Sequence, residues 1–370
     1  MTSPRTVAVV TGSRADYGLL RPVMRAIRDH PDLDLLVLAT GTHLLPAAGT
    51  HQEVAAEFEV AATIPMQEAG RGRRTDEAIA LGRGICGLGA FFARTPVDIV
   101  LLLGDRIEAF AAAAAAAVAG VRVAHMHGGD RAEGIADESL RHAITKLAHV
   151  HLPATEQSAR RIAALGEEPR RIHLVGSPAV DGLREVPPLD DDTFEALGRP
   201  EILFMLHPAG DSAGKERRRA ERLLAACARF GRVLAMDPNY DAGRDGIIAA
   251  IGESGCRREA HLPRGDFIRL LKRAKLLVGN SSAGLIECAA LGVRCINVGT
   301  RQAGRELPDN VIDVPEWEMG PIEAAISRGL AEPSNGVSHP FGGGRAGLRT
   351  AQLLATLDFS EHPLAKLNVF

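Results

Sequence analysis

The stretch DIVLLLGDRIEAFAAAAAAAVAGVRVAHMHGG (residues 98–129) decides the fold of this chain. It opens with a continuous apolar run, passes through an uninterrupted block of alanines and closes on a second apolar run. Strands that are buried on both faces of a parallel sheet read as continuous apolar runs, and alanine is the strongest helix former. The stretch therefore predicts a parallel β-α-β unit, with strands over 98–104 and 121–129.

The same alternation recurs on both sides of this unit. In the first half, apolar runs at 7–12, 33–41 and 171–177 lie among helical patterns, and a second set covers 201–208, 231–239, 274–280 and 293–299. Strands that alternate with helices favour an α/β class with doubly wound parallel sheets. We expect two Rossmann-like halves without a sequence repeat.

The chain divides where its composition changes. The stretch REVPPLDDDTFEALGRP (184–200) is rich in proline and acidic residues, as a linker is. We predict an N-terminal Rossmann-like domain over 1–183, a linker over 184–200 and a C-terminal Rossmann-like domain over 201–345. A C-terminal helix and tail over 346–370 are expected to pack back on the N-terminal domain.

The overall composition limits the classes of partner. The 370 residues carry a formal net charge of −3, which argues against general binding to nucleic acid or to a membrane surface. No apolar run reaches the ~18 residues of a membrane span, and the N-terminus lacks a signal-peptide pattern. The five cysteines are scattered, which is consistent with free thiols in a reducing cytoplasm.

Familiar cofactor motifs fail on inspection. GDSAGK (210–215) has three residues between its glycines instead of four, and Glu216 stands where a P-loop needs serine or threonine. There is no GxGxxG, and HMH (125–127) lacks a third ligand at metal-binding spacing. We therefore expect no cofactor and no metal, with zinc at HMH as the alternative.

Polar residues gather where the predicted strands end. Ligands of open α/β sheets bind beyond the carboxyl ends of the strands, so these residues predict a shared cleft between the two halves. The set is Arg14, His43, Asp105, His127, His207, Asn239 and Ser281.

VGNSSAGLIECAALG (278–292) reads as a strand, a tight loop and a helix. Free N–H groups at a helix start favour anions, the hydroxyls of Ser281 and Ser282 add donors, and Glu287 could accept hydrogen bonds from a ribose. The loop GTRQAGRE (299–306) offers Arg301 and Arg305 to a phosphate. The alternatives are that Asn280 and Ser281 only cap the helix and that the arginines are solvated.

GIADESLRHAITKL (134–147) is an amphipathic helix by its apolar spacing. Asp137 and Glu138 point about 100° apart on it, so one can face the cleft. Asp137 could instead stabilise the helix dipole, and Asp105 could be a helix cap. His127 is followed by two glycines that permit close ligand approach. His125 lies nearer the core and is expected to be structural.

Together these segments resemble the hydrolysing UDP-N-acetylglucosamine 2-epimerases of sialic acid-type pathways. The resemblance runs in order from about residue 7 to about residue 310. It is carried by SRADYG (13–18), TGTHL (40–44), LGDRIEAF (103–110), HMHGG (125–129), DESLRHAITKLAH (137–149), HP (207–208), PNYDAG (238–243), GNSSAGLIE (279–287) and GTRQAGRE (299–306). It implies the GT-B fold, with two Rossmann-like domains, an interdomain cleft and a homodimer or homotetramer.

The resemblance also implies roles for individual residues. Asp105, His127 and Asp137 match the acid/base positions, with Glu138 as a neighbour that could substitute for Asp137, and His207 matches a further family histidine. Ser281, Ser282, Glu287 and Arg301 match UDP-binding positions, and Arg14 matches a phosphate-side arginine.

Two positions distinguish this chain within the family it resembles. Many relatives have glutamate at the position of His127, where an imidazole can also exchange protons near neutral pH. Leu19 stands where the non-hydrolysing branch has lysine, which favours the hydrolysing branch.

The expected reaction is conversion of UDP-GlcNAc and water to N-acetylmannosamine and UDP, by elimination of UDP and hydration of 2-acetamidoglucal. One alternative substrate is a UDP-2,4-diacetamido-2,4,6-trideoxyhexose. A GT-B glycosyltransferase and a binding module without catalysis are alternative classes.

Overall fold

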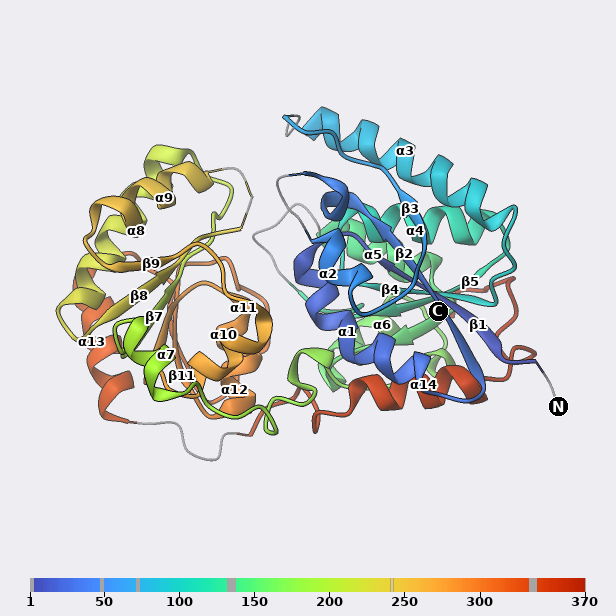
Figure 1. The fold of residues 1–370 in the computed structure, drawn as a ribbon. Coiled ribbons are helices and arrows are strands. Elements are labelled where there is room, and N and C mark those ends of the chain that lie inside the picture. The colour runs from blue at the N-terminus through green and yellow to red at the C-terminus, as the bar shows by residue number, and fades with distance from the viewer. Residues whose placement is uncertain are drawn as a thin grey trace. The chain divides into compact units, whose positions relative to one another are not determined.

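The computed structural model describes residues 3–46, 50–70, 74–131, 138–239, 241, 243–332 and 338–369. The chain forms two compact units. The first comprises Met1–Asp130, Ala136–Asp181 and Gly342–Phe370, and the second is built chiefly from Gly182–Phe341. Within the described residues, each unit contains one six-stranded sheet with helices on both faces (Figure 1).

The sheet of the first unit is wholly parallel, in the order β3-β2-β1-β4-β5-β6. The order in which strands are added therefore reverses at β1. The chain adds β2 and β3 on one side of β1, and then β4, β5 and β6 on the other side. The strands are β1 (Arg5–Thr11), β2 (Leu33–Thr40), β3 (Val60–Ile64), β4 (Ile99–Leu103), β5 (Arg122–Met126) and β6 (Val150–Leu152). The helices are α1 (Arg14–Arg28), α2 (His51–Ala55), α3 (Arg74–Phe92), α4 (Ile107–Val118), α5 (Glu138–Leu147), α6 (Glu156–Ala164) and α14 (Ala346–Thr356).

The alanine block forms α4, as predicted. Five of its alanines are buried, because α4 lies between the sheet and α3. Small side chains allow this close approach: a Cβ at Gly84 of α3 would lie 3.0 Å from the Cβ of Ala111. The block is therefore an inner layer of the core.

One predicted strand of this unit is wrong. Residues 171–177 form no strand; they contain the end of a 3-10 turn, η2 (Pro169–Arg171), and a single bridge between Ile172 and His151. The neighbouring strand β6 is only three residues long, so it offers residues 171–177 few backbone groups with which to pair. Two further 3-10 turns, η1 (Gly41–Leu44) and η3 (Pro178–Val180), follow β2 and this segment.

The second unit repeats the strand order of the first. Its sheet reads β12-β11-β10-β7-β8-β9, again wholly parallel, with the reversal between β7 and β10. The strands are β7 (Ile202–Met205), β8 (Val233–Met236), β9 (Arg257–Glu259), β10 (Leu276–Gly279), β11 (Arg294–Val298) and β12 (Val311–Val314). The helices are α7 (Asp191–Ala196), α8 (Ala213–Ala228), α9 (Arg244–Glu253), α10 (Arg264–Leu271), α11 (Ser282–Leu285), α12 (Glu287–Leu291) and α13 (Met319–Ala331).

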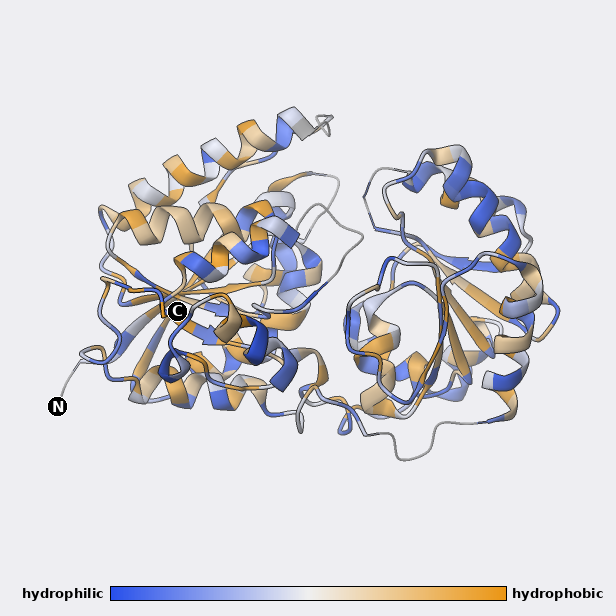
Figure 2. Cartoon of the chain, turned by 180° about the vertical axis from the view of Figure 1, so that it is seen from behind, coloured by the Kyte–Doolittle hydropathy of each residue, from blue (hydrophilic) through white to orange (hydrophobic). Residues whose placement is uncertain are grey.

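Both sheets consist largely of apolar residues (Figure 2). This composition is what burial on both faces requires, and it confirms the predicted α/β class with two Rossmann-like domains. Two such domains in one chain are the architecture of the GT-B class. The predicted cleft between them stays a prediction.

Helix α7 lies within the segment expected as a linker. Its Phe194 ring lies under the guanidinium of Arg273, whose central carbon is 4.2 Å from the ring centroid. The ammonium of Lys272 donates to the carbonyls of Arg184 and Val186. These contacts attach the segment to α10 and the turn after it.

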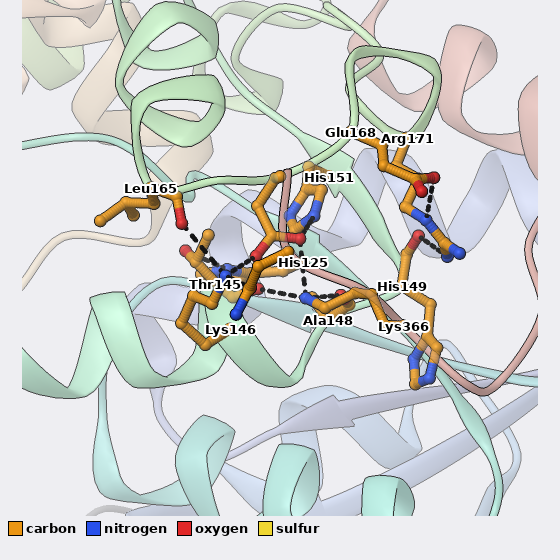
Figure 3. A network of polar contacts seen from close by, with 12 residues as sticks. His125, Thr145, Lys146, Ala148, His149, His151, Leu165, Glu168, Arg171 and Lys366 are labelled. Carbon is orange, nitrogen blue, oxygen red and sulfur yellow. Dashed lines mark hydrogen bonds and ion pairs between the residues drawn. The ribbon is translucent and has the colours of Figure 1, made fainter. Parts of the chain in front are cut away.

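The C-terminal segment completes the first unit. Helix α14 packs on α1, and the carboxylate of Asp181 accepts the backbone N–H groups of Ala346 and Gly347 at 2.8 and 2.7 Å. Beyond the helix, the ammonium of Lys366 donates to the carbonyl of Ala148 at 2.8 Å and to Glu167 at 2.7 Å (Figure 3).

Glu167 is a buried carboxylate that contacts the ammonium groups of Lys146 and Lys366 and the imidazole of His151. Lys146 lies 2.6 Å from it and His151 3.0 Å from it. Burial opposes its ionisation, but the hydrogen bonds from His151, Lys146 and Lys366 outweigh burial and lower the pKa of Glu167 to about 2. The tail is therefore held by a charged centre.

Among the helices that the structure describes, none has the length and apolar character that crossing a membrane requires.

Candidate active site

The polar loops of the second unit meet where its sheet changes direction. The side chain of Asn280, just after β10, accepts the backbone N–H of His207 at 2.7 Å and donates to the carbonyl of His207 at 2.9 Å. His207 follows β7. A Cβ at Gly279 would lie 1.9 Å from the carbonyl oxygen of Met205, so only glycine allows this approach. The two strand ends therefore form one rigid corner.

His207 is held neutral in this corner. Its Nδ1 accepts the backbone N–H of Asn239 at 3.2 Å, so the ring proton must sit on Nε2. Burial, and then the charge of Arg301, lower the pKa of His207 to about 3. The predicted catalytic histidine is thus a neutral imidazole that offers an N–H donor.

The loop after β11 joins the same corner. Arg301 donates to the carbonyl of Asn280 at 3.2 Å, and the side chain of Gln302 donates to the same carbonyl at 2.8 Å. The GTRQAGRE loop therefore contacts the GNSSAG loop, partly through Gln302, which sequence reasoning missed. Arg305 is partly buried in the same loop.

The helix predicted after GNSSAG is interrupted. Ser281 caps α11 by accepting the N–H of Ala283 at 3.4 Å, and α11 gives way to α12 at Ile286. Asn280 does not cap the helix, because its side chain is used on His207. Ser282 is the first residue of α11. The available N–H groups thus belong to a four-residue helix, whose dipole is small.

Glu287 begins α12 and is buried. Its Oε1 accepts a hydrogen bond from Arg264 of α10 at 2.8 Å. Asn239 follows β8, and its side-chain nitrogen donates to Asp241 at 2.6 Å. The structure thus brings His207, Ser281 and Arg301 to one corner, with Asn239 bound to it through its backbone.

The first unit gathers a second polar cluster at its own sheet reversal. Arg141 of α5 is 3% exposed and pairs with Asp105, which follows β4, and with Glu138 at 2.7 Å. It also donates to the backbone carbonyl of Asp130 at 2.7 Å. Arg141 thus joins two of the predicted acid/base groups. Asp137, another of these groups, lies outside the described residues.

His127 lies beside this cluster, immediately after β5. Its backbone is left-handed, with φ of 60°. Its Nδ1 lies 2.8 Å from Oδ2 of Asp130, and its Nε2 lies 3.1 Å from Oγ of Ser177. Sequence reasoning missed both partners, since Asp130 shows only as an acid after a glycine pair and Ser177 is distant in the chain.

The remaining predicted residues lie at the end of β1 and β2. Arg14 is exposed at the start of α1. His43 is buried, and its ring nitrogens lie 2.9 Å from the hydroxyl of Thr11 and 2.7 Å from that of Thr50. Burial lowers the pKa of His43 to about 4. Both nitrogens are thus engaged by the protein, so a direct contact with a ligand would require the loss of one hydrogen bond.

His125 has the structural role that was expected. It is fully buried, and its Nε2 lies 2.7 Å from the carbonyl of Gly104. Burial lowers the pKa of His125 to about 4. The neutral ring joins β5 to the turn that carries Asp105.

Two Rossmann-like units, each with polar side chains at its sheet reversal, define a GT-B-class α/β protein. Residues 25–355 match the family model described as UDP-N-acetylglucosamine 2-epimerase. The chain belongs to the UDP-N-acetylglucosamine 2-epimerase family, and its enzyme class is that of the UDP-sugar 2-epimerases.

Individual relatives cover nearly the whole chain. It is 35% identical to the UDP-N,N′-diacetylbacillosamine 2-epimerase (hydrolyzing) of Legionella pneumophila, over 99% of this chain and 100% of the relative. It is 32% identical to a UDP-N-acetylglucosamine 2-epimerase of Neisseria meningitidis, over 92% of this chain and 91% of the relative. A solved structure, the Methanocaldococcus jannaschii UDP-GlcNAc 2-epimerase with UDP-GlcNAc and UDP, has the same fold. Its TM-score is 0.80 at 18% identity, over 94% of this chain and 99% of that one.

Proposed function

We propose that this protein is a hydrolysing 2-epimerase that converts a UDP-2-acetamido sugar and water to the C2-epimeric free sugar and UDP. The first support is the Legionella relative, which the chain matches along nearly its whole length. The name of that relative describes it as a hydrolysing enzyme. The second is Leu19, which stands where the non-hydrolysing branch has lysine.

The observation that carries the proposal is the cluster of Asp105, Glu138, Arg141 and His127 in the first unit. Elimination removes the proton at C2 as the C1–O bond to UDP breaks, and hydration returns a proton to C2 from the other face. Inversion therefore needs two groups that exchange protons. The cluster supplies two carboxylates and one imidazole, and we assign Asp137 to the same function.

The second unit binds the UDP moiety in this proposal. A departing diphosphate needs cationic groups and N–H donors, and Arg301, the Nε2–H of His207 and the hydroxyls of Ser281 and Ser282 are of that kind. We propose that Glu287 binds the ribose and that Arg14 binds the phosphates. Asn239, whose backbone N–H donates to His207, is proposed to form part of the same binding site. His43 supports the Arg14 loop through Thr11.

The sugar is proposed from the relatives. The Legionella protein, at 35% identity, is named for UDP-N,N′-diacetylbacillosamine, which favours a 2,4-diacetamido-2,4,6-trideoxy sugar. The Neisseria protein, at 32% identity, is named for UDP-N-acetylglucosamine, which supports UDP-GlcNAc as a second candidate. We also propose that the enzyme works in the cytoplasm as a homodimer or homotetramer.

Turnover in deuterated water tests the reaction and the substrate together. Each UDP-sugar is incubated with the enzyme, and products are followed by NMR. Free sugar with inverted C2 that carries deuterium, together with UDP, is the expected product. An intact epimerised UDP-sugar contradicts hydrolysis, and transfer to an acceptor with the C2 hydrogen retained indicates a glycosyltransferase. The faster substrate decides the sugar.

A further inference from the structure

The loop from His127 to Asp130 has a shape that its neighbours impose. Gly129 has φ of 76°, and a Cβ there would lie 2.2 Å from the carbonyl oxygen of Ser158 in α6. A Cβ at Gly128 would lie 2.9 Å from Nδ1 of His125. The glycines therefore let the loop press against β5 and α6, and this turn brings the side chains of His127 and Asp130 together.

Asp130 is fixed through both of its carboxylate oxygens. Oδ2 lies 2.8 Å from Nδ1 of His127, and Oδ1 accepts the hydroxyl of Ser158 at 2.7 Å. Ser158 is fully buried in the first turn of α6, and its own oxygen accepts the hydroxyl of Thr155 at 3.1 Å. A chain of hydrogen bonds thus runs from the cap of α6 to the imidazole of His127.

The hydrogen bonds decide where the ring proton lies. A carboxylate can only accept, so Nδ1 of His127 carries a hydrogen. The Oγ of Ser177 accepts the backbone N–H of Ala179 at 3.2 Å, and its own hydrogen is available to donate to the bare Nε2 of this tautomer, 3.1 Å away. The neutral form of His127 therefore carries its hydrogen on Nδ1, and its Nε2 holds the lone pair.

We propose that Asp130 is a positioning residue that holds His127 in the Nδ1–H tautomer, so that Nε2 accepts the C2 proton when UDP is eliminated. This inference depends on the proposed function. In the step, Nε2 bonds to the proton, the C2–H electron pair forms the C1=C2 double bond, and the C1–O pair leaves on UDP. Ser177 must release Nε2 first. The imidazolium that results is stabilised by the adjacent Asp130 carboxylate.

The neighbouring carboxylates are less suited to this step. One oxygen of Asp105 and one oxygen of Glu138 pair with Arg141, and a guanidinium beside a carboxylate disfavours its protonation. Nε2 of His127 instead carries only a neutral hydroxyl donor. Among the described residues of the cluster, His127 is thus the best suited proton acceptor, and a rotation of the Ser177 side chain can release its Nε2.

The tautomer can be measured without substrate. In the ¹⁵N-labelled enzyme, two-bond ¹H–¹⁵N correlations report which ring nitrogens carry hydrogen, and His127→Gln assigns the signals among the thirteen histidines. The expected pattern is a protonated Nδ1 and a bare Nε2. In Asp130→Asn, Ser158 retains the side-chain oxygen, so the amide nitrogen faces Nδ1 and the ring should switch to Nε2–H. A wild-type ring with Nε2–H, or no change in Asp130→Asn, overturns the proposal.

Kinetics supply a second readout. Replacing the aspartate of a serine-protease triad by asparagine lowers kcat about 10⁴-fold through the wrong tautomer, and outer partners of catalytic groups typically account for about 10- to 100-fold. We expect Asp130→Asn to lower kcat at least 100-fold while KM and UDP affinity change by less than about threefold. Ser158→Ala should lower kcat by about tenfold. Retention of most kcat by Asp130→Asn contradicts the proposal.

The controls separate this inference from the proposed function. Glu156→Gln changes an exposed carboxylate of the same helix as Ser158 and should leave kcat unchanged. UDP binding and the melting temperature show whether each variant is folded. If the wild type turns over no UDP-sugar, the proposed function fails, whereas the NMR experiment still decides the tautomer.

Discussion

Asn280 and His207 are joined by two reciprocal hydrogen bonds, in which the side chain of Asn280 pairs with both backbone groups of His207 at 2.7 and 2.9 Å. This pair connects β7 to β10 at the sheet reversal of the second unit. It fixes the backbone on which His207 and Ser281 are carried, so the position of both donors depends on one buried amide.

Asn280→Asp is expected to weaken this corner. The variant retains an acceptor but loses the donor to the His207 carbonyl, which leaves that carbonyl unpaired at a cost of about 1–3 kcal/mol. UDP affinity should fall about tenfold, which corresponds to ~1.4 kcal/mol. Calorimetric titration with UDP and urea unfolding measure the two effects. Gln352→Glu, the same change on an exposed face of α14, is the control, and equal behaviour of the two variants contradicts the prediction.

Arg141→Met should affect both stability and activity. It leaves the carboxylates of Asp105 and Glu138 without the buried guanidinium between them. Removal of one member of a buried charged group costs about 3–5 kcal/mol, and we expect kcat to fall by about 10- to 100-fold. Arg141→Lys keeps the charge but not the planar fork, so its kcat should lie between that of the wild type and that of Arg141→Met. Arg160→Met, at an arginine whose side chain is 72% exposed, provides the baseline, and a match to that baseline would refute the role of Arg141.

Stability should fall as the pH decreases from about 6.5 to about 4. Burial lowers the pKa of His149 from 6.5 to about 4. The unfolded chain therefore binds the proton more tightly than the folded one, and protonation favours unfolding throughout that interval. His149 should account for on the order of 2 kcal/mol of this loss. Unfolding free energies measured from pH 7 to pH 4 should be less pH-dependent in His149→Gln than in the wild type or in His30→Gln. An unchanged slope in His149→Gln counts against this assignment.

Glu167 adds a second interval at lower pH. Its pKa is lowered from 4.5 to about 2 in the folded state, so its contribution is complete above pH 4.5 and is lost as the pH falls toward 2.

Lys366→Met tests how the tail is held at neutral pH. The variant removes one of the cations at the buried Glu167 and the hydrogen bond to the carbonyl of Ala148 (Figure 3). Because Lys146 and His151 remain, we expect a loss of about 1–3 kcal/mol in urea unfolding at pH 7. Lys275→Met removes an exposed ion pair with Glu201 and should cost only ~0–1 kcal/mol. Equal losses in the two variants would show that the buried contacts of Lys366 stabilise the protein no more than an exposed ion pair does.

Removal of metal ions should not change turnover. The proposed elimination and hydration need proton exchange and stabilisation of the leaving diphosphate, and side chains of this chain supply both. Dialysis against EDTA is expected to leave kcat and KM unchanged. A loss of activity that added Mg²⁺ restores would show that a metal ion is required.

The sequence alone was sufficient for the fold class and for much of the candidate site. Buried parallel strands must be apolar along their whole length, so eight of the strands could be found from apolar runs, and their carboxyl ends located Asp105, His127, His207 and Ser281. It was less informative at the sheet edges. The strands β3, β9 and β12 are short edge strands, and β9 is the polar triplet Arg257–Glu259; the expected strand at 171–177 failed for lack of an edge to pair with.

Only the tertiary structure decided which side chains pair. Nothing in the spacing of the chain shows that Arg141 reaches Asp105, or that Asp130 and Ser177 hold the two nitrogens of His127. Apolar periodicity depends on local geometry, which repeats along the chain. A hydrogen bond instead depends on where loops from distant segments come together to within about 3 Å, and that is determined by the packing of the whole unit.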